Sequence, residues 1–145
     1  MRQDTVGSEV KKSLTVPFGI LNDMISHCIG EYPNEACGIL AGKDGIVKNI
    51  YKMKNIENSP VSFMMDPTEQ LRVMKQIRTE GLLMLAIFHS HPFASSYPSA
   101  KDVNLAFYDD VIYIIVSLAE DIPIVKGYSI SEGRVEEINI ITEGI

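Results

Sequence analysis

The sequence predicts an α/β domain in which a mostly central β-sheet is flanked by helices. Most apolar residues fall in short runs bounded by turn signals, as is typical of strands, and two longer segments carry apolar residues at helical spacing. The length of 145 residues corresponds to about one domain, and the 46% hydrophobic and 22% charged residues are typical of a globular protein. A domain of this size needs no metal or disulfide to complete its core, so a metal here would be functional rather than structural.

The chain begins with a polar segment and a strand–helix unit. Residues 1–12 are polar and aperiodic, so we expect a flexible tail there and a single domain over residues 13–145. Residues 13–16 predict a short strand, and Pro17 suits the first turn of a helix that ends near Glu31. The apolar residues of this helix fall on one face: Leu21, Ile25, Cys28 and Ile29.

A hairpin and a second helix follow. Residues 37–41 and 46–53 predict two strands, which the turn pair Asp44-Gly45 joins. Asp66-Pro67-Thr68-Glu69 combines an N-cap acid with a proline at the first helical position and a glutamate at the third. The helix therefore begins there and ends before Gly81. Three apolar residues are expected on its buried face: Leu71, Met74 and Ile77.

The second half of the chain is expected to complete the sheet. Residues 82–88 are apolar on both faces, which predicts a central buried strand that places His89 at its carboxyl end. The remaining expected elements are a loop at 92–98, a short helix from Ser99, a buried strand at 111–118, and a hairpin of strands 124–130 and 134–141.

Charge and hydropathy disfavour several classes of function. The net charge of −6, from 13 basic and 19 acidic residues, and the lack of a basic cluster argue against nucleic acid as a partner. The longest apolar run, residues 82–88, is too short to span a bilayer, so we expect no membrane partner. With two cysteines and no apolar signal core near the N-terminus, the expected compartment is the cytoplasm.

The most informative segment is HSHPFASSYPSAKD, residues 89–102. His89 and His91 are two positions apart at a strand end, where alternation points both rings the same way and toward one metal ion. Asp102 adds a carboxylate, and three protein ligands leave a fourth position open, as a hydrolytic zinc site requires. For the His-x-His pair alone, two loop histidines without a ligand remain an alternative.

Several of these residues also have structural interpretations. Ser99-x-x-Asp102 is close to a capping box, although a carboxylate in that position can still aim one oxygen at a metal. His27 and the two cysteines are interpreted as structural residues. Glu35 lies at a helix-to-strand junction, and its own surroundings do not mark it as catalytic.

Together these residues resemble the pattern of the JAMM (MPN-type) metalloproteases. That pattern is an upstream glutamate, then His-x-His-Pro, with seven residues between the second histidine and a serine and two more residues before an aspartate. The chain matches every spacing with Glu35, His89-Ser90-His91-Pro92, Ser99 and Asp102.

The resemblance extends over about residues 14–142. PNEACGILAG at 33–42 and the segment at 58–67 are also similar to segments of small prokaryotic members. The resemblance implies the MPN fold, a curved mixed central β-sheet flanked by helices.

The resemblance also implies a role for each matching residue. His89, His91 and Asp102 would bind one zinc ion per chain, with a water in the fourth position. Glu35 would hold that water, accept its proton and pass it to the leaving amine, and Ser99 would hydrogen-bond the oxyanion. Because none of these residues is missing, we expect an active zinc metallopeptidase.

A substrate class is implied as well. Family members that cut ubiquitin chains carry insertions, whereas this compact chain looks like small prokaryotic proteins that process the Gly-Gly tails of ubiquitin-like or sulfur-carrier proteins. We therefore expect hydrolysis of a peptide, isopeptide or adduct bond at such a tail. Residues 93–97, between the ligands, are expected to form a wall of the substrate groove.

Two other functions stay open. A catalytically silent MPN scaffold or interaction module would not need the ligand set that this chain retains. Two histidines and one carboxylate also make up the facial triad of non-haem iron oxygenases. In those enzymes one histidine lies close to the carboxylate and the other far away, so the order found here favours zinc.

Overall fold

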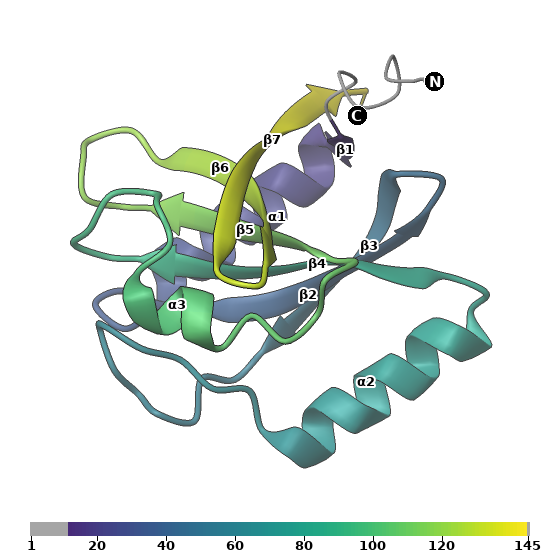
Figure 1. Ribbon diagram of the computed structural model, residues 1–145, viewed down its shortest axis with the longest axis horizontal. Helices are drawn as coiled ribbons and strands as arrows, with labels where there is room; N and C mark the ends of the chain where they lie inside the picture. Colours follow the sequence, from purple (N-terminus) through teal and green to yellow (C-terminus); the bar gives the residue numbers. More distant parts are fainter. Residues whose placement is uncertain (1–11, 145) are drawn as a thin grey trace.

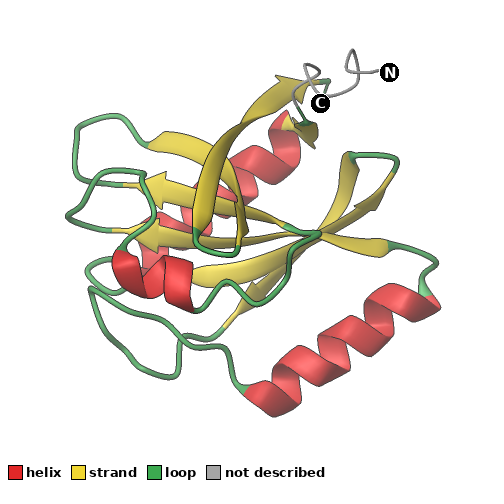
Figure 2. Ribbon diagram, in the orientation of Figure 1, coloured by secondary structure: helices red, strands yellow, loops and turns green. Residues whose placement is uncertain are grey.

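The computed structural model describes residues 12–144, so the predicted tail at 1–12 lies outside the described residues except for the exposed Lys12. Within this range the strands are β1 (Ser13–Pro17), β2 (Cys37–Lys43), β3 (Ile46–Met53), β4 (Leu83–His91), β5 (Ile112–Ser117), β6 (Ile124–Ser131) and β7 (Arg134–Glu143). The helices are α1 (Phe18–Glu31), α2 (Pro67–Thr79) and α3 (Ala100–Asn104) (Figure 2). Each expected strand and helix is confirmed to within a few residues. No helix in 12–144 is long and apolar enough to cross a bilayer.

The sheet is mixed and strongly curved, as expected. Its strand order is β1-β3-β2-β4-β5-β6-β7, and β1 also pairs with β7, so the sheet closes into a barrel. β4 runs parallel to β5, and β1 runs parallel to both of its neighbours, while the other pairs are antiparallel. The closure was not predicted, because it depends on a pairing between the two ends of the chain.

The two longer helices, α1 and α2, pack on opposite faces of the sheet (Figure 1). Alternate residues of the central strand β4 pack into two hydrophobic core clusters. Phe88 lies in the cluster on the side of α1, and Ile87 lies in the cluster on the side of α2. Since strand side chains alternate, His89 and His91 continue the face of Ile87. The site therefore lies on the face that α2 covers.

The predicted helix faces are partly wrong. Ile29 in α1 is 55% exposed and Leu71 in α2 is 56% exposed, while Met24 and Val73 are buried instead. Both helices carry enough apolar residues to form more than one stripe of helical spacing, and packing against the sheet selects the stripe that is buried. Cys28 and Ile77 are buried as expected.

Candidate metal centre

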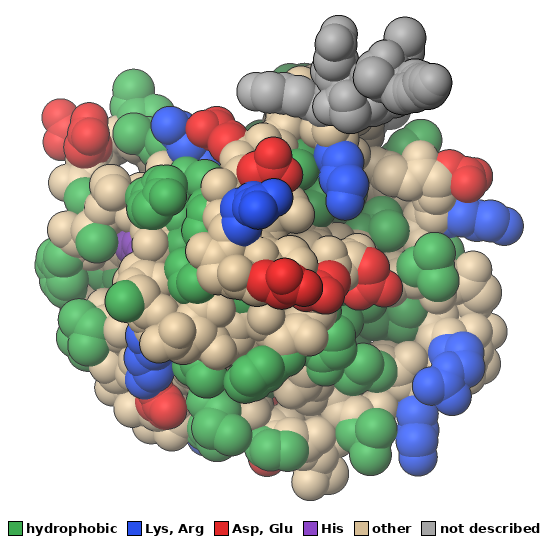
Figure 3. Space-filling model, in the orientation of Figure 1, with side chains coloured by type: hydrophobic (Ala, Val, Ile, Leu, Met, Phe, Trp, Pro, Cys, Tyr) green, Lys and Arg blue, Asp and Glu red, His purple; other side chains and the backbone are tan. Residues whose placement is uncertain are grey.

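The carboxyl end of β4 carries both histidines on one face. His89 and His91 are 2% and 5% exposed, and their Nε2 atoms lie 3.1 Å apart. On the face drawn in Figure 3 only a small histidine surface is visible. The expected convergence of the two rings is therefore present in the fold.

Asp102 reaches the same point from α3. Its Oδ2 lies 3.0 Å from the Nε2 of His91 and 3.2 Å from the Nε2 of His89. The backbone N–H of Ser99 donates to this oxygen at 2.9 Å, and the Oγ of Ser99 accepts from the N–H of Asp102 at 3.0 Å. The predicted capping box is thus formed, and it aims the carboxylate at the imidazoles.

The three side chains fit a metal ion. His89, His91 and Asp102 each offer one ligand atom, and these atoms all lie within 4.8 Å of one another. Ligands about 2.0–2.2 Å from one tetrahedral ion are separated by about 3.3–3.6 Å, a few tenths of an ångström more than the 3.0–3.2 Å found here. Two imidazoles and one carboxylate suit a divalent transition metal. The group is therefore a candidate metal site.

Hydrogen bonds and packing orient the two rings. The Nδ1 of His91 lies 2.7 Å from the carbonyl of Ser95, so with its proton on Nδ1 the ring presents the lone pair of Nε2 to a metal. Phe63 stacks on His89 with ring centroids 4.5 Å apart. The buried Nδ1 of His89 has no hydrogen-bond partner among the described residues, so the polar contacts of this ring are those of its Nε2 with Asp102 and His91.

The charge states of His89 and Asp102 favour a cation. Burial lowers the pKa of His89, which keeps its imidazole neutral. Burial alone would raise the pKa of Asp102, but hydrogen bonds from His89 and His91 outweigh it and hold that pKa well below its usual range. A neutral imidazole and an ionised carboxylate are the forms that bind metals. At His91, burial would lower the pKa, but hydrogen bonds with Asp102 and with the carbonyl of Ser95 outweigh it and raise that pKa in the metal-free protein.

Strand pairing brings Glu35 to this site. Cys37 of β2 pairs with His89 of β4, and the N–H of Ser90 donates to the carbonyl of Ala36 at 3.0 Å. The N–H of Ala36 in turn donates to the Oγ of Ser90 at 2.8 Å. These contacts fix the backbone next to Glu35, which sequence spacing could not place.

The carboxyl group of Glu35 is buried beside the metal-binding group. Glu35 is 3% exposed, and its Oε1 has no hydrogen-bond partner among the described residues. Burial raises the pKa of the Glu35 carboxyl group to about 8. The charge of His91 lowers this pKa, and the charge of Asp102 raises it. A buried carboxyl with a perturbed pKa next to a metal-binding group is typical of a catalytic base.

The metal-free protein should become less stable with rising pH because of Glu35. Its pKa is about 8 in the fold against 4.5 ordinarily, so between these values the folded state binds the extra proton. The stabilising contribution is complete below pH 4.5 and is lost as pH rises through 8. Denaturant titrations with chelator should show the free energy of unfolding of the wild type falling relative to Glu35→Gln over this range, whereas parallel curves would contradict the buried carboxyl.

The residues interpreted as structural behave as expected. Both cysteines are free and buried, and burial raises the pKa of each thiol to about 12. His27 lies on α1, and its Nε2 is 3.2 Å from the carbonyl of Cys37. His27 thus links α1 to β2, and Cys28 packs in the core on the side of α1, whereas Cys37 packs in the core on the side of α2.

The sequence assigned no role at the site to three residues that lie around it: Ser90, Lys101, and Phe63 of the segment at 58–67 that resembles the family. Ser90 could have been found from the motif, because it stands between the two histidines, and Phe63 from the resemblance of its segment, whereas Lys101 carried no distinctive spacing. In the 93–97 loop, Phe93 lies 5.4 Å from the ring of Tyr32, and Tyr97 lies 5.6 Å from that of Tyr128. Both are more than half exposed, and their contact with substrate stays a prediction.

Comparisons with known proteins found a matching family model and similar proteins from other organisms. The family model for prokaryotic homologs of the JAB domain matches residues 19–128. The chain is 33% identical over 135 residues to a CysO-cysteine peptidase of Mycobacterium tuberculosis, covering 90% of this chain and 92% of that protein. It is 36% identical over 110 residues to a desampylase of Pyrococcus furiosus, covering 75% and 76%. A solved structure from Desulfitobacterium hafniense is 40% identical, has a TM-score of 0.83, and is matched over 91% of this chain and 94% of that one.

Proposed function

Since the chain belongs to the prokaryotic JAB family of JAMM/MPN proteins, we propose that it is a zinc peptidase that hydrolyses the bond after the C-terminal glycine of a ubiquitin-like or sulfur-carrier protein. The observation that carries this proposal is the convergence of His89, His91 and Asp102 beside a buried carboxyl group, that of Glu35. The peptidase relatives support the hydrolase class, and the intact ligand set argues against a silent scaffold.

In the proposed reaction His89, His91 and Asp102 hold the metal. Zinc there would lower the pKa of a bound water to about 7 and polarise the scissile carbonyl. Glu35 accepts the proton of this water and delivers it to the leaving amine. Burial raises the pKa of Glu35 in the metal-free chain, and the positive charge of a bound ion would lower it again toward the ionised form that accepts a proton.

Ser99 is proposed to stabilise the developing oxyanion. Its Oγ already accepts a hydrogen bond from the N–H of Asp102, which leaves the hydroxyl proton free to donate. Because α3 is anchored by its cap, this donor is positioned before substrate arrives, as effective oxyanion stabilisation requires.

The relatives' names support the substrate class. The M. tuberculosis relative is named for removing cysteine from CysO, and the P. furiosus relative is named a desampylase. A glycine tail has no side chains, so it can approach a metal set between the buried carboxyl end of β4 and the start of α3. The proposed partner is therefore a carrier protein whose tail bears a single amino acid, such as cysteine, or a conjugated protein.

Mass spectrometry can test the reaction. Zinc-loaded protein would be incubated with a Gly-Gly-terminated sulfur-carrier protein extended by one cysteine, and with the same carrier joined to a lysine side chain. Loss of the cysteine or lysine conjugate, abolished by a chelator, supports the proposal. Intact conjugates after long incubation with zinc-loaded protein would contradict it.

A further inference from the structure

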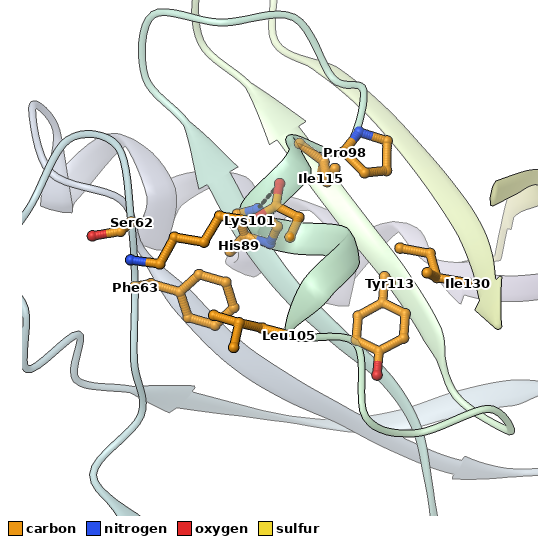
Figure 4. Close-up of a pocket in the computed structure, with 10 residues that line it drawn as sticks. Ser62, Phe63, His89, Pro98, Lys101, Leu105, Tyr113, Ile115 and Ile130 are labelled. Atoms are coloured by element: carbon orange, nitrogen blue, oxygen red, sulfur yellow. Dashed lines mark ion pairs between the residues drawn. The ribbon is translucent and has the colours of Figure 1, made fainter. Parts of the chain in front are cut away.

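A narrow pocket opens directly beside His89 and Asp102, and it has a volume of about 30 Å³. That is room for about two water-sized groups, which suits a small side chain and not an aromatic one. Most of its wall is apolar (Figure 4). The residues that close it are Phe63, Pro98, Leu105, Tyr113, Ile115 and Ile130.

The chemistry of the substrate indicates which part of it would use this pocket. This step rests on the proposed function, in which the residues before the scissile bond are glycines. Glycine has no side chain to bury, so a side-chain pocket beside the metal-binding group serves the residue on the leaving side. The size of the pocket then sets the size of that leaving residue.

Lys101 lies at the same pocket and is the only lysine or arginine among the residues that line it. Its side chain extends from α3 across to the segment that carries Ser62 and Phe63 (Figure 4). There its Nζ lies 3.5 Å from Oε1 of Glu57, with both side chains about a third to a half exposed. Exposed ion pairs of this kind contribute little, so the ammonium can exchange Glu57 for another carboxylate.

We propose that Lys101 binds the α-carboxylate of a single leaving amino acid whose small side chain enters the pocket. The substrate is then a Gly-Gly tail that ends in one residue of about the size of cysteine. Water adds its oxygen to the glycine carbonyl carbon, the C–N bond breaks, and the amine leaves with the proton that Glu35 carries. A lysine isopeptide has no carboxylate next to its scissile bond and does not engage Lys101.

The carboxylate contact can be tested with two matched substrates. A carrier ending in Gly-Gly-Cys with a free carboxylate is compared with its C-terminal carboxamide. Lys101→Met should raise the KM for the acid about tenfold and change the KM for the amide little, because a charged hydrogen bond is lost only with the acid. Lys48→Met is the control, because this substitution removes the same charge from an exposed lysine of β3 that lies outside the pocket.

A binding measurement separates this role from an effect on turnover. In a zinc-loaded Glu35→Gln background, calorimetry should show tighter binding of the acid than of the amide, and Lys101→Met should remove the difference. Equal losses for acid and amide, or no loss for either, would overturn the role of Lys101 while hydrolysis of both leaves the proposed function intact. Failure of the wild type to cleave any Gly-tail probe would reject the proposed function and this inference with it.

The leaving residue itself tests the pocket. Carriers that end in Gly-Gly-Cys, Gly-Gly-Ala and Gly-Gly-Phe carry the same carboxylate and differ only in side-chain size. The kcat/KM should be similar for cysteine and alanine and at least about tenfold lower for phenylalanine, because the pocket holds only about two water-sized groups. Equal values for all three would show that the pocket does not receive the leaving side chain.

Discussion

Replacing Glu35 by glutamine should lower kcat by about a hundred- to ten-thousand-fold while the bound metal is retained. Glutamine has almost the same shape as glutamate but cannot accept a proton. Because the Oε1 of Glu35 has no hydrogen-bond partner among the described residues, the exchange breaks no contact of that oxygen. The loss should therefore be one of proton transfer rather than of structure.

Steady-state kinetics beside metal analysis of the same samples would measure this effect. Glu31→Gln is a matched control, because Glu31 is an exposed glutamate at the end of α1. This control should keep wild-type kcat. Full activity in Glu35→Gln would remove Glu35 from the mechanism, and a parallel loss of metal would assign it a role in metal binding instead.

Replacing Ser99 by alanine should lower kcat by about a hundred- to a thousand-fold, since a preorganised oxyanion donor is removed. The variant also loses the N-cap of α3, in which the Oγ of Ser99 accepts from the N–H of Asp102. Loss of such a cap costs about 1 kcal/mol of stability, which must be measured separately by denaturant titration.

Ser99→Thr separates the two effects, because threonine keeps both the hydroxyl donor and the capping oxygen. It should retain metal and most of the activity, whereas Ser99→Ala should retain metal with little activity. If Ser99→Ala loses its metal in proportion to its activity, Ser99 acts by holding Asp102 and not by donating to the oxyanion.

The local elements of this fold could be predicted from the sequence because their signals are local. Asp66-Pro67 caps and starts α2, and the Asp66 side chain accepts from the N–H of Glu69 as the motif indicates. Asp44-Gly45 forms the turn between β2 and β3 with positive φ at both residues. The closure of β1 onto β7 could not be predicted, because it joins segments more than 120 residues apart.

In the candidate site, too, the features set by local sequence could be predicted and the one set by long-range pairing could not. The convergence of His89 and His91 follows from strand alternation alone, and the capping box with Asp102 follows from spacing within one turn. The place of Glu35 depends on pairing between β2 and β4, which no local pattern encodes. Only the resemblance to a family connected it to the metal ligands, and its burial and raised pKa now give physical support to that connection.

The most direct test of this account is the metal content of the purified chain, measured by elemental analysis for the wild type and for Asp102→Ala. The account predicts about one zinc per wild-type chain and little or none in the variant, because Asp102 supplies the only carboxylate of the metal-binding group. No zinc in the wild type after reconstitution would contradict the proposal that the chain is a zinc peptidase. Bound iron with oxygen-dependent activity would contradict it as well and would favour an oxygenase.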